Sequence, residues 1–318
     1  MQRIAFFLIA ILLLRCTTIN MEGTPQRYAA GPAATLLLPY FETSDSLRYD
    51  TSLTITNTGD TERTIRFTFW TDHGFATLWF SDSIGPHATR TLSVASILSG
   101  GYVLGPKEGH LPCQNFGPSP PDCAGHTIPT LVLSDANCLL RGSATSLCES
   151  RVSERHAHSI GYVTVDLVSG DGLLPPTDRR FYATMLNANV LTGTYEQRAG
   201  GAVLASGPLV HLAARDGLAS TFYGTFSHGD DHREALPAKA TVALPDHGEA
   251  ELHIWTGPVM ASQRCEDFAR PVVTSRRIRP WRRQTTIPID HQTWIAVSKP
   301  TPPDPSATPP PERCKRAF

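Results

Sequence analysis

The most concentrated set of metal-binding side chains is the segment His228-Gly229-Asp230-Asp231-His232. Imidazoles and carboxylates are ligands that transition metals accept, and paired carboxylates also suit Ca²⁺. Gly and Asp are equally common in turns, and this loop spacing does not place both imidazoles on one helical face. The sequence therefore favours a solvated turn. A metal-binding module with ligands His228, Asp230 and His232 is the alternative, and no other cofactor is expected.

Asp72 and His73 follow Trp70 and form a carboxylate–imidazole pair of the kind used in acid–base chemistry. A hydrogen-bonded turn that closes the preceding strand is the interpretation that the sequence favours. The catalytic motifs G-x-S-x-G, H-E-x-x-H and G-x-x-x-x-G-K-[ST] are absent from the sequence. Because glycosidase carboxylates carry little local signature, an extracytoplasmic hydrolase acting on glycans stays an alternative.

Several aromatic residues occupy the polar-facing register of segments that alternate apolar and polar residues. In the segment 250–256 we expect Leu252 and Ile254 to face inward, and His253 and Trp255 to face outward. Outward Trp and Tyr rings form stacking platforms for sugars or contacts for a protein partner. The alternative is that they pack against residues 100–158 or a second sheet. The full set is Trp70, Trp79, Trp255, Trp294, Tyr40, Tyr162 and Tyr223.

An arginine-rich stretch spans residues 264–283, with seven arginines against two acidic residues. Arg279 and Trp281 within it are candidates for contacting an anionic glycan, lipid headgroups or nucleic acid. A solvated connection before the last strand is the favoured interpretation. The formal net charge of −1 for the whole chain argues against a nucleic-acid partner.

The N-terminus predicts export. Arg3 precedes eleven unbroken apolar residues, Ile4 to Leu14, a length typical of a signal peptide over 1–18 and too short to span a bilayer comfortably. A short anchoring helix or a start at Met21 are the alternatives. Lipidation at Cys16 is disfavoured because a large charged residue precedes it. We expect a secreted or extracytoplasmic protein, in the periplasm or at the cell surface, with no transmembrane helix after cleavage.

Cysteine usage agrees with export. Six of the seven cysteines lie beyond the signal, an even number that indicates disulfide bonds. The simplest pairing is Cys113–Cys123, Cys138–Cys148 and Cys265–Cys314, although fifteen arrangements are possible. Zinc is the weaker alternative because no C-x-x-C spacing occurs.

Alternation of apolar and polar residues sets the expected fold. In Thr51–Asn57 and Thr64–Thr71 the apolar residues share one face, which is typical of half-buried antiparallel strands. We therefore predict an all-β fold, an antiparallel β-sandwich of immunoglobulin-like or jelly-roll-like type. One β block would span 33–100 and a second 159–298, separated by a disulfide-stapled insert over 101–158 and followed by a Pro-rich tail over 299–318.

These blocks contain the elements that must position the candidate residues. A short helix is expected over 130–140, after Pro129. The expected strands are 35–41, 51–58, 64–71, 77–82, 89–96, 161–167, 181–190, 208–214, 220–226, 238–244, 250–256 and 293–298.

The segments Ala34–Glu42 (ATLLLPYFE) and Trp70–Gly74 (WTDHG) carry a resemblance to a known family. The chain resembles an uncharacterised family of exported bacterial proteins that share an ATLLLPYFE opening and a W-T-D-W-G motif. The likeness runs over about 33–268. His73 stands where the family has Trp, and Thr256-Gly257 where it tends to have Arg-Asp. No activity is assigned to that family, so the resemblance implies no catalytic residues. A looser, fold-level likeness to bacterial immunoglobulin-like modules rests on the Asn57-Thr58-Gly59 turn.

The sequence thus predicts an exported, non-enzymatic structural or interaction protein that acts in surface adhesion or ligand binding. A cell-surface glycan or protein is the expected partner. The candidate binding residues are Trp70, Asp72, His73, Trp255, Arg279 and Trp281.

Overall fold

The computed structural model describes these parts of the chain: residues 31–44, 48–100, 130–142, 153–170, 174, 176, 178–216, 222–223, 232–234, 236, 239–243, 250–256, 271–278, 284–288 and 293–298. They are mostly strand, and the strands pair into antiparallel sheets. The all-β prediction is confirmed. The expected signal (1–18) and Pro-rich tail (299–318) lie outside the described residues.

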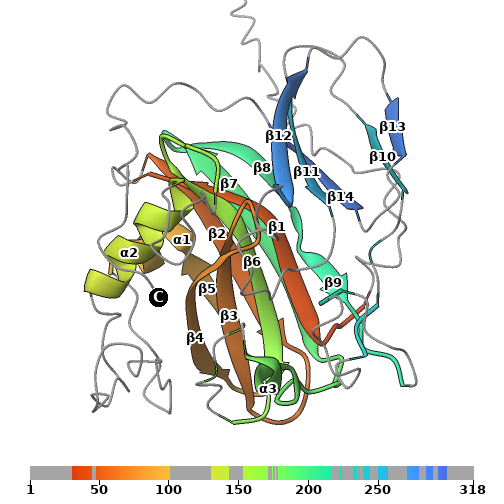
Figure 1. Ribbon diagram of the computed structural model, residues 1–318. Helices are drawn as coiled ribbons and strands as arrows, with labels where there is room; N and C mark the ends of the chain where they lie inside the picture. The colour runs from red at the N-terminus through yellow and green to blue at the C-terminus, as the bar shows by residue number, and fades with distance from the viewer. Residues whose placement is uncertain are drawn as a thin grey trace, which may run out of the picture.

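The largest sheet has five strands in the order β4-β3-β6-β1-β9 (Figure 1). Its strands are β4 (Ala76–Ile84), β3 (Arg63–Thr71), β6 (Ser159–Val168), β1 (Thr35–Thr43) and β9 (Val210–Leu212). The near-continuous burial along β1, β3, β4 and β6 shows that both faces of this sheet are covered.

A four-stranded sheet has the order β5-β2-β7-β8. Its strands are β5 (Thr89–Ser93), β2 (Tyr49–Asn57), β7 (Leu191–Ala199) and β8 (Ala202–Pro208). Burial alternates cleanly along β2 and β7, so this sheet has one covered face and one solvated face. On the solvated face threonine hydroxyls pair across strands, Thr54 with Thr91 at 3.0 Å and Thr56 with Thr89 at 2.8 Å.

One apolar core joins these two sheets. Its side chains include Phe41 and Phe69 from the five-stranded sheet and Leu53, Ile55 and Tyr195 from the four-stranded sheet. The helices α1 (Val94–Leu98) and α2 (Thr130–Leu140) also contribute buried residues to it, and they lie together at one side of the strands (Figure 1). Strands of both expected β blocks therefore pair within the same two sheets.

A second apolar core covers the opposite face of the five-stranded sheet. It includes Trp70, Tyr162 and Val210 from that sheet, together with Tyr182 and Trp255 from later elements. The short helix α3 (Arg179–Tyr182) belongs to this layer. A three-stranded sheet in the order β12-β11-β14 stands beside β1 (Figure 1), and β10 pairs separately with β13. These strands are β10 (Lys239–Ala243), β11 (Ala250–Thr256), β12 (Val273–Ile278), β13 (Gln284–Pro288) and β14 (Thr293–Ser298).

Several expected elements are confirmed, among them the helix over 130–140 and the strands over 250–256 and 293–298. The strand expected over 89–96 stops at Ser93, because the Ser93 side chain accepts a hydrogen bond from Ser96 N at 2.9 Å and caps α1. The prediction of a strand over 181–190 is wrong. Asp178 caps the short helix α3 instead, by accepting a hydrogen bond from Arg180 N.

Four strands were not anticipated: β7, β8, β12 and β13. In β7 the buried positions include Gly193 and Gln197, so the apolar alternation that marks a half-buried strand is weak there. Within the part of the chain that the structure describes, no helix is long and apolar enough to cross a membrane.

Candidate functional site

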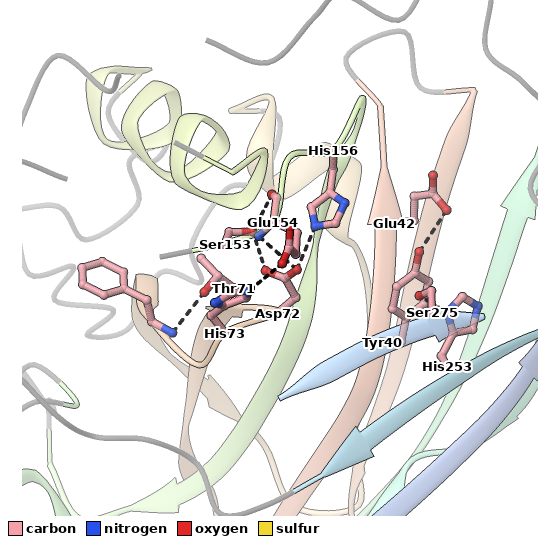
Figure 2. A network of polar contacts seen from close by, with 11 residues as sticks. Tyr40, Glu42, Thr71, Asp72, His73, Ser153, Glu154, His156, His253 and Ser275 are labelled. Carbon is pink, nitrogen blue, oxygen red and sulfur yellow. Dashed lines mark hydrogen bonds and ion pairs between the residues drawn. The ribbon is translucent and has the colours of Figure 1, made fainter. Parts of the chain in front are cut away.

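The turn between β3 and β4 holds Asp72 and His73. The Thr71 N–H donates to Phe75 O at 2.8 Å, and Gly74 N donates to Thr71 O at 2.9 Å. Gly74 has a φ of 83°, a left-handed conformation that glycine adopts at little cost. The turn therefore presents the Asp72 side chain to the segment 153–156 (Figure 2).

The Asp72 carboxylate is bound by three groups from that segment. Ser153 Oγ donates to Asp72 Oδ1, while Glu154 N donates to Asp72 Oδ2 at 3.3 Å. His156 Nε2 lies 2.8 Å from the same Oδ2. The Asp72 side chain is 4% exposed and that of His156 is 21% exposed, so the pair lies at the edge of the buried region. Asp72 is thus a buried acceptor that fixes residues 153–156 to the turn.

The backbone of Asp72 holds a third segment. Its carbonyl oxygen accepts hydrogen bonds from Val272 N at 2.6 Å and from Val273 N at 2.9 Å, at the start of β12. His73 Nε2 lies 3.7 Å from Glu154 Oε1, which adds a contact to the segment 153–156. The sequence interpretation of a hydrogen-bonded turn therefore describes the local geometry, and the turn also links two distant segments.

The chemistry of this cluster differs from that of a serine nucleophile with its base. In the Ser-His-Asp arrangement the imidazole lies between the hydroxyl and the carboxylate. Here Ser153 donates its hydroxyl proton to Asp72 directly, and His156 contacts the other oxygen of the same carboxylate. The arrangement leaves a carboxylate–imidazole pair with a partly exposed ring, which is able to transfer a proton.

A second polar cluster surrounds Glu42 on β1 (Figure 2). Its Oε1 lies 2.6 Å from His158 Nδ1, and its Oε2 accepts a hydrogen bond from Tyr40 OH at 3.1 Å. The Tyr40 ring stacks on His253 of β11, and His253 Nδ1 lies 2.8 Å from Ser275 Oγ of β12. This cluster joins the five-stranded sheet to the three-stranded sheet.

Burial sets the protonation of this second cluster. It lowers the pKa of His253 to about 4, and the charge of Glu42 opposes that shift only in part. It also raises the pKa of Tyr40 well above its ordinary value, as do the nearby charges of Glu42 and Glu251. His253 is therefore neutral and Tyr40 a neutral hydrogen-bond donor at physiological pH. A small pocket opens beside them and is lined by Tyr40, Glu42, Tyr49, Gln197, Arg198 and His253.

The expectation of exposed aromatic residues in the polar-facing register is wrong for Trp70 and Trp255, which pack against another layer instead. Trp70 is 1% exposed and Trp255 is 0% exposed, and His253 is also buried. The rings pack on one another: Trp70 is stacked on Tyr162 with centroids 5.9 Å apart, and Trp255 is stacked on Phe222 at 5.7 Å. These rings pack in the second apolar core because the five-stranded sheet is covered on both faces.

A buried charged group lies in the same layer. Asp166 on β6 is 0% exposed. Its Oδ1 accepts hydrogen bonds from Thr35 Oγ1 at 2.6 Å and from Tyr223 OH at 2.5 Å. Arg233 Nε donates to the same Thr35 Oγ1 at 2.7 Å. Desolvation raises the pKa of Asp166, opposed first by Arg233 and by the two hydrogen bonds.

The remaining candidate residues lie mostly outside the described residues. These are Arg279, Trp281, His228 and Asp230. Of the three candidate metal ligands only His232 is described, and its backbone φ is 39°. Within the described ranges, no group of three His, Cys, Asp or Glu residues is placed to hold a metal ion. Cys138 lies on α2, whereas Cys113, Cys123, Cys148, Cys265 and Cys314 lie outside the described residues. The disulfide pairing stays a prediction.

Sequence reasoning did not anticipate Ser153, His158, Arg66 or Arg233 as parts of these clusters. Their partners are far away in the chain: Ser153 is 81 residues from Asp72, and Arg233 is 198 residues from Thr35. The local signal at Arg66 was a charge inside an alternating strand, which by itself indicates an exposed position. No protein-family model, curated protein or solved structure matches the chain.

Proposed function

We propose that this chain is an extracytoplasmic, non-enzymatic structural and interaction protein, built on a β-sandwich of immunoglobulin-like or jelly-roll-like type. The first apolar core supports the sandwich because side chains of the five-stranded and four-stranded sheets meet in it. The apolar leader at residues 4–14 supports export.

The observation that carries the structural role is the use made of Asp72. Both oxygens of its carboxylate contact polar groups of the segment 153–156. Its backbone oxygen accepts hydrogen bonds from the segment 272–273. The groups best suited to acid–base chemistry thus tie three parts of the chain together. Such a tether favours a structural protein over one that keeps its carboxylate available to a substrate.

A glycan hydrolase is the second candidate, favoured by the partly exposed His156 ring against a buried carboxylate. The variant Asp72→Asn separates the two proposals, assayed on bacterial cell-wall polysaccharide and by thermal unfolding. A tether predicts a lower unfolding midpoint and no hydrolysis by the wild-type protein. Hydrolysis by the wild-type protein that Asp72→Asn abolishes without changing its midpoint would favour the enzyme.

For the interaction role, we propose that the pocket beside Tyr40 contacts a cell-surface glycan. A carboxylate, an amide and a guanidinium line it, and these groups commonly form hydrogen bonds with sugar hydroxyls. Co-sedimentation with purified peptidoglycan tests this proposal. Binding should fall in the double variant Gln197→Ala/Arg198→Ala and persist in Arg180→Ala, which removes an exposed arginine of α3. Equal binding by both variants, or none by the wild-type protein, would exclude the pocket as a glycan site.

The proposed location has a direct test. In a Gram-negative host, fractionation should place the full chain outside the cytoplasm, with a new N-terminus close to residue 19. A form lacking residues 1–18 should stay in the cytoplasm. Equal distribution of the two forms would argue against a signal peptide.

A further inference from the structure

The second apolar core contains polar atoms that nothing in the described part of the chain satisfies. Arg66 Nε and Nη1 and Asp166 Oδ2 are buried and have no hydrogen-bond partner there. Both residues are 0% exposed. An unsatisfied buried polar atom costs free energy, and most such atoms in proteins have a partner, whether protein, water or ligand.

The two side chains project from the same face of the five-stranded sheet. Arg66 on β3 and Asp166 on β6 are register partners, and partners directly opposite share a face. Arg66 Nη2 donates to Leu174 O, and its guanidinium carbon lies 4.5 Å from the centroid of the Phe181 ring. Their unsatisfied atoms therefore belong to the interior between this sheet and α3.

Arg66 is a buried cation, and its hydrogen bond in the described part of the chain goes to a neutral carbonyl oxygen. Asp166 is one carboxylate near two guanidinium groups, Arg66 and Arg233. Arg233 donates to the neutral oxygens of Thr35, Asn187 and Leu186. Burial lowers the pKa of Arg66 to about 9, so its side chain is still cationic at neutral pH. The buried charge of Arg66 therefore favours an anionic partner.

We propose that this interior binds a small hydroxy acid, with its carboxylate on Arg66 Nε and Nη1 and its hydroxyl donating to Asp166 Oδ2. Guanidinium groups bind carboxylates through several N–H donors, which gives strong charge-assisted hydrogen bonds. A plain carboxylate would leave Asp166 Oδ2 without a donor, and a hydroxyl next to the carboxylate supplies one. The Thr68 hydroxyl, two residues along β3, is also buried without a partner among the described residues and offers a further donor.

Glycolate and acetate test this site because they differ by one hydroxyl. Thermal unfolding of the purified chain is followed in sodium glycolate, acetate and chloride at constant ionic strength. Glycolate should raise the unfolding midpoint, and above its dissociation constant the rise should follow the logarithm of the glycolate concentration, since a ligand that binds only the folded state stabilises it. Acetate should act at higher concentration than glycolate, and chloride least.

Substitutions assign the effect to the two residues. Arg66→Met should weaken glycolate binding by about ten- to a hundredfold, as expected for the loss of charge-assisted hydrogen bonds. Arg180→Met, at an exposed arginine of α3, should leave the affinity unchanged. Asp166→Asn should tighten acetate binding by removing a repulsive charge and reduce the preference for glycolate over acetate.

Glycolate binding at Arg66 and the proposed glycan contact are tested by separate measurements, so either can be excluded without the other. Equal midpoints in the three salts would overturn glycolate binding at Arg66, as would an unchanged affinity in Arg66→Met. If Arg66→Met does not fold, Arg66→Lys keeps the charge but loses the planar set of donors. Wild-type affinity for glycolate in Arg66→Lys, or an unchanged glycolate preference in Asp166→Asn, would also overturn it.

Discussion

The ring of His253 lies face to face on the ring of Tyr40, with centroids 3.6 Å apart and planes 13° from parallel. The two residues come from different sheets, so the stack is a contact between layers. Tyr40 belongs to β1 and His253 to β11, and both are buried. Burial lowers the pKa of His253, so its ring is neutral in this contact at physiological pH.

The stack predicts acid sensitivity. In the folded chain the pKa of His253 is about 4, because of burial, whereas an unfolded histidine has a pKa of about 6.5. Above about pH 6.5 the ring is neutral in both states and the contribution to stability is complete. Between about pH 6.5 and 4 only the unfolded chain takes up the proton, so stability falls, by up to about 3 kcal/mol.

Urea unfolding at several pH values from 7 to 4 measures this loss. The variant His253→Phe keeps an aromatic ring for the stack and removes the titrating group. Its free energy of unfolding should therefore decline less steeply over this range than that of the wild-type protein. Parallel curves for the two proteins would show that His253 does not cause the acid sensitivity.

Asp72→Asn should destabilise the fold by about 2 kcal/mol, because it removes the charge that strengthens several buried hydrogen bonds. Asp60→Asn is the matched control. Asp60 also contacts a histidine, His87, at 2.9 Å, but both side chains are exposed, so no measurable change is expected.

A double-mutant cycle isolates the contact between Asp72 and Ser153. Ser153→Ala alone and combined with Asp72→Asn should give a coupling free energy of about 1 kcal/mol or more, as is usual for residues in one hydrogen-bond network. Strict additivity in chemical denaturation would mean that the serine does not stabilise the tether.

Gly161→Ala should be severely destabilising. A Cβ at Gly161 on β6 would lie 2.0 Å from the backbone oxygen of Trp70 on β3, so the two strands would have to separate. We expect a loss of about 3 kcal/mol, the upper range for overpacking. Gly207→Ala is the control, because a Cβ there would meet Tyr195 at an ordinary 3.6 Å. Similar midpoints in chemical denaturation for the two variants would contradict this geometry.

The predicted disulfide bonds are tested on protein that is purified from the periplasm, denatured and then treated with a thiol reagent. Three disulfide bonds among the six cysteines beyond the leader predict no reactive thiol, and peptide mapping should recover Cys113–Cys123, Cys138–Cys148 and Cys265–Cys314. Protein produced in a reducing cytoplasm provides the reactive reference. Two or more thiols in the periplasmic sample would contradict the pairing.

The sequence predicted elements well where one strand face is apolar and the other polar. The strand β2 shows this, since Leu53 and Ile55 alternate with threonine and serine. The alternation did not predict β7. Gly193 occupies a buried position of that strand, because Leu209 and the Thr54 backbone leave no room for a side chain. Local hydrophobicity carries no sign of such a close approach.

Alternation also predicts which residues share a face, but not whether another layer covers that face. Trp70 and Trp255 were assigned to polar-facing positions and are buried because the second apolar core covers them. Similarly, Asp72 was recognised as a candidate from its pairing with His73, whereas its partner His156 is 84 residues away. Contacts over such distances depend on the strand order, which alternation does not specify.

The strand order of the five-stranded sheet has a consequence for how the chain matures. β1 begins at Thr35, but its two neighbours are β6 and β9, and Thr35 bonds to a residue 131 positions later. As the chain is synthesised from its N-terminus, β1 gains its first neighbour only after residues 159–168 have emerged, and its second after 210–212. Formation of this sheet therefore depends on contacts between distant residues, which are slow to form in proteins. Until then the apolar β1 segment has no partner strand, a condition that favours aggregation.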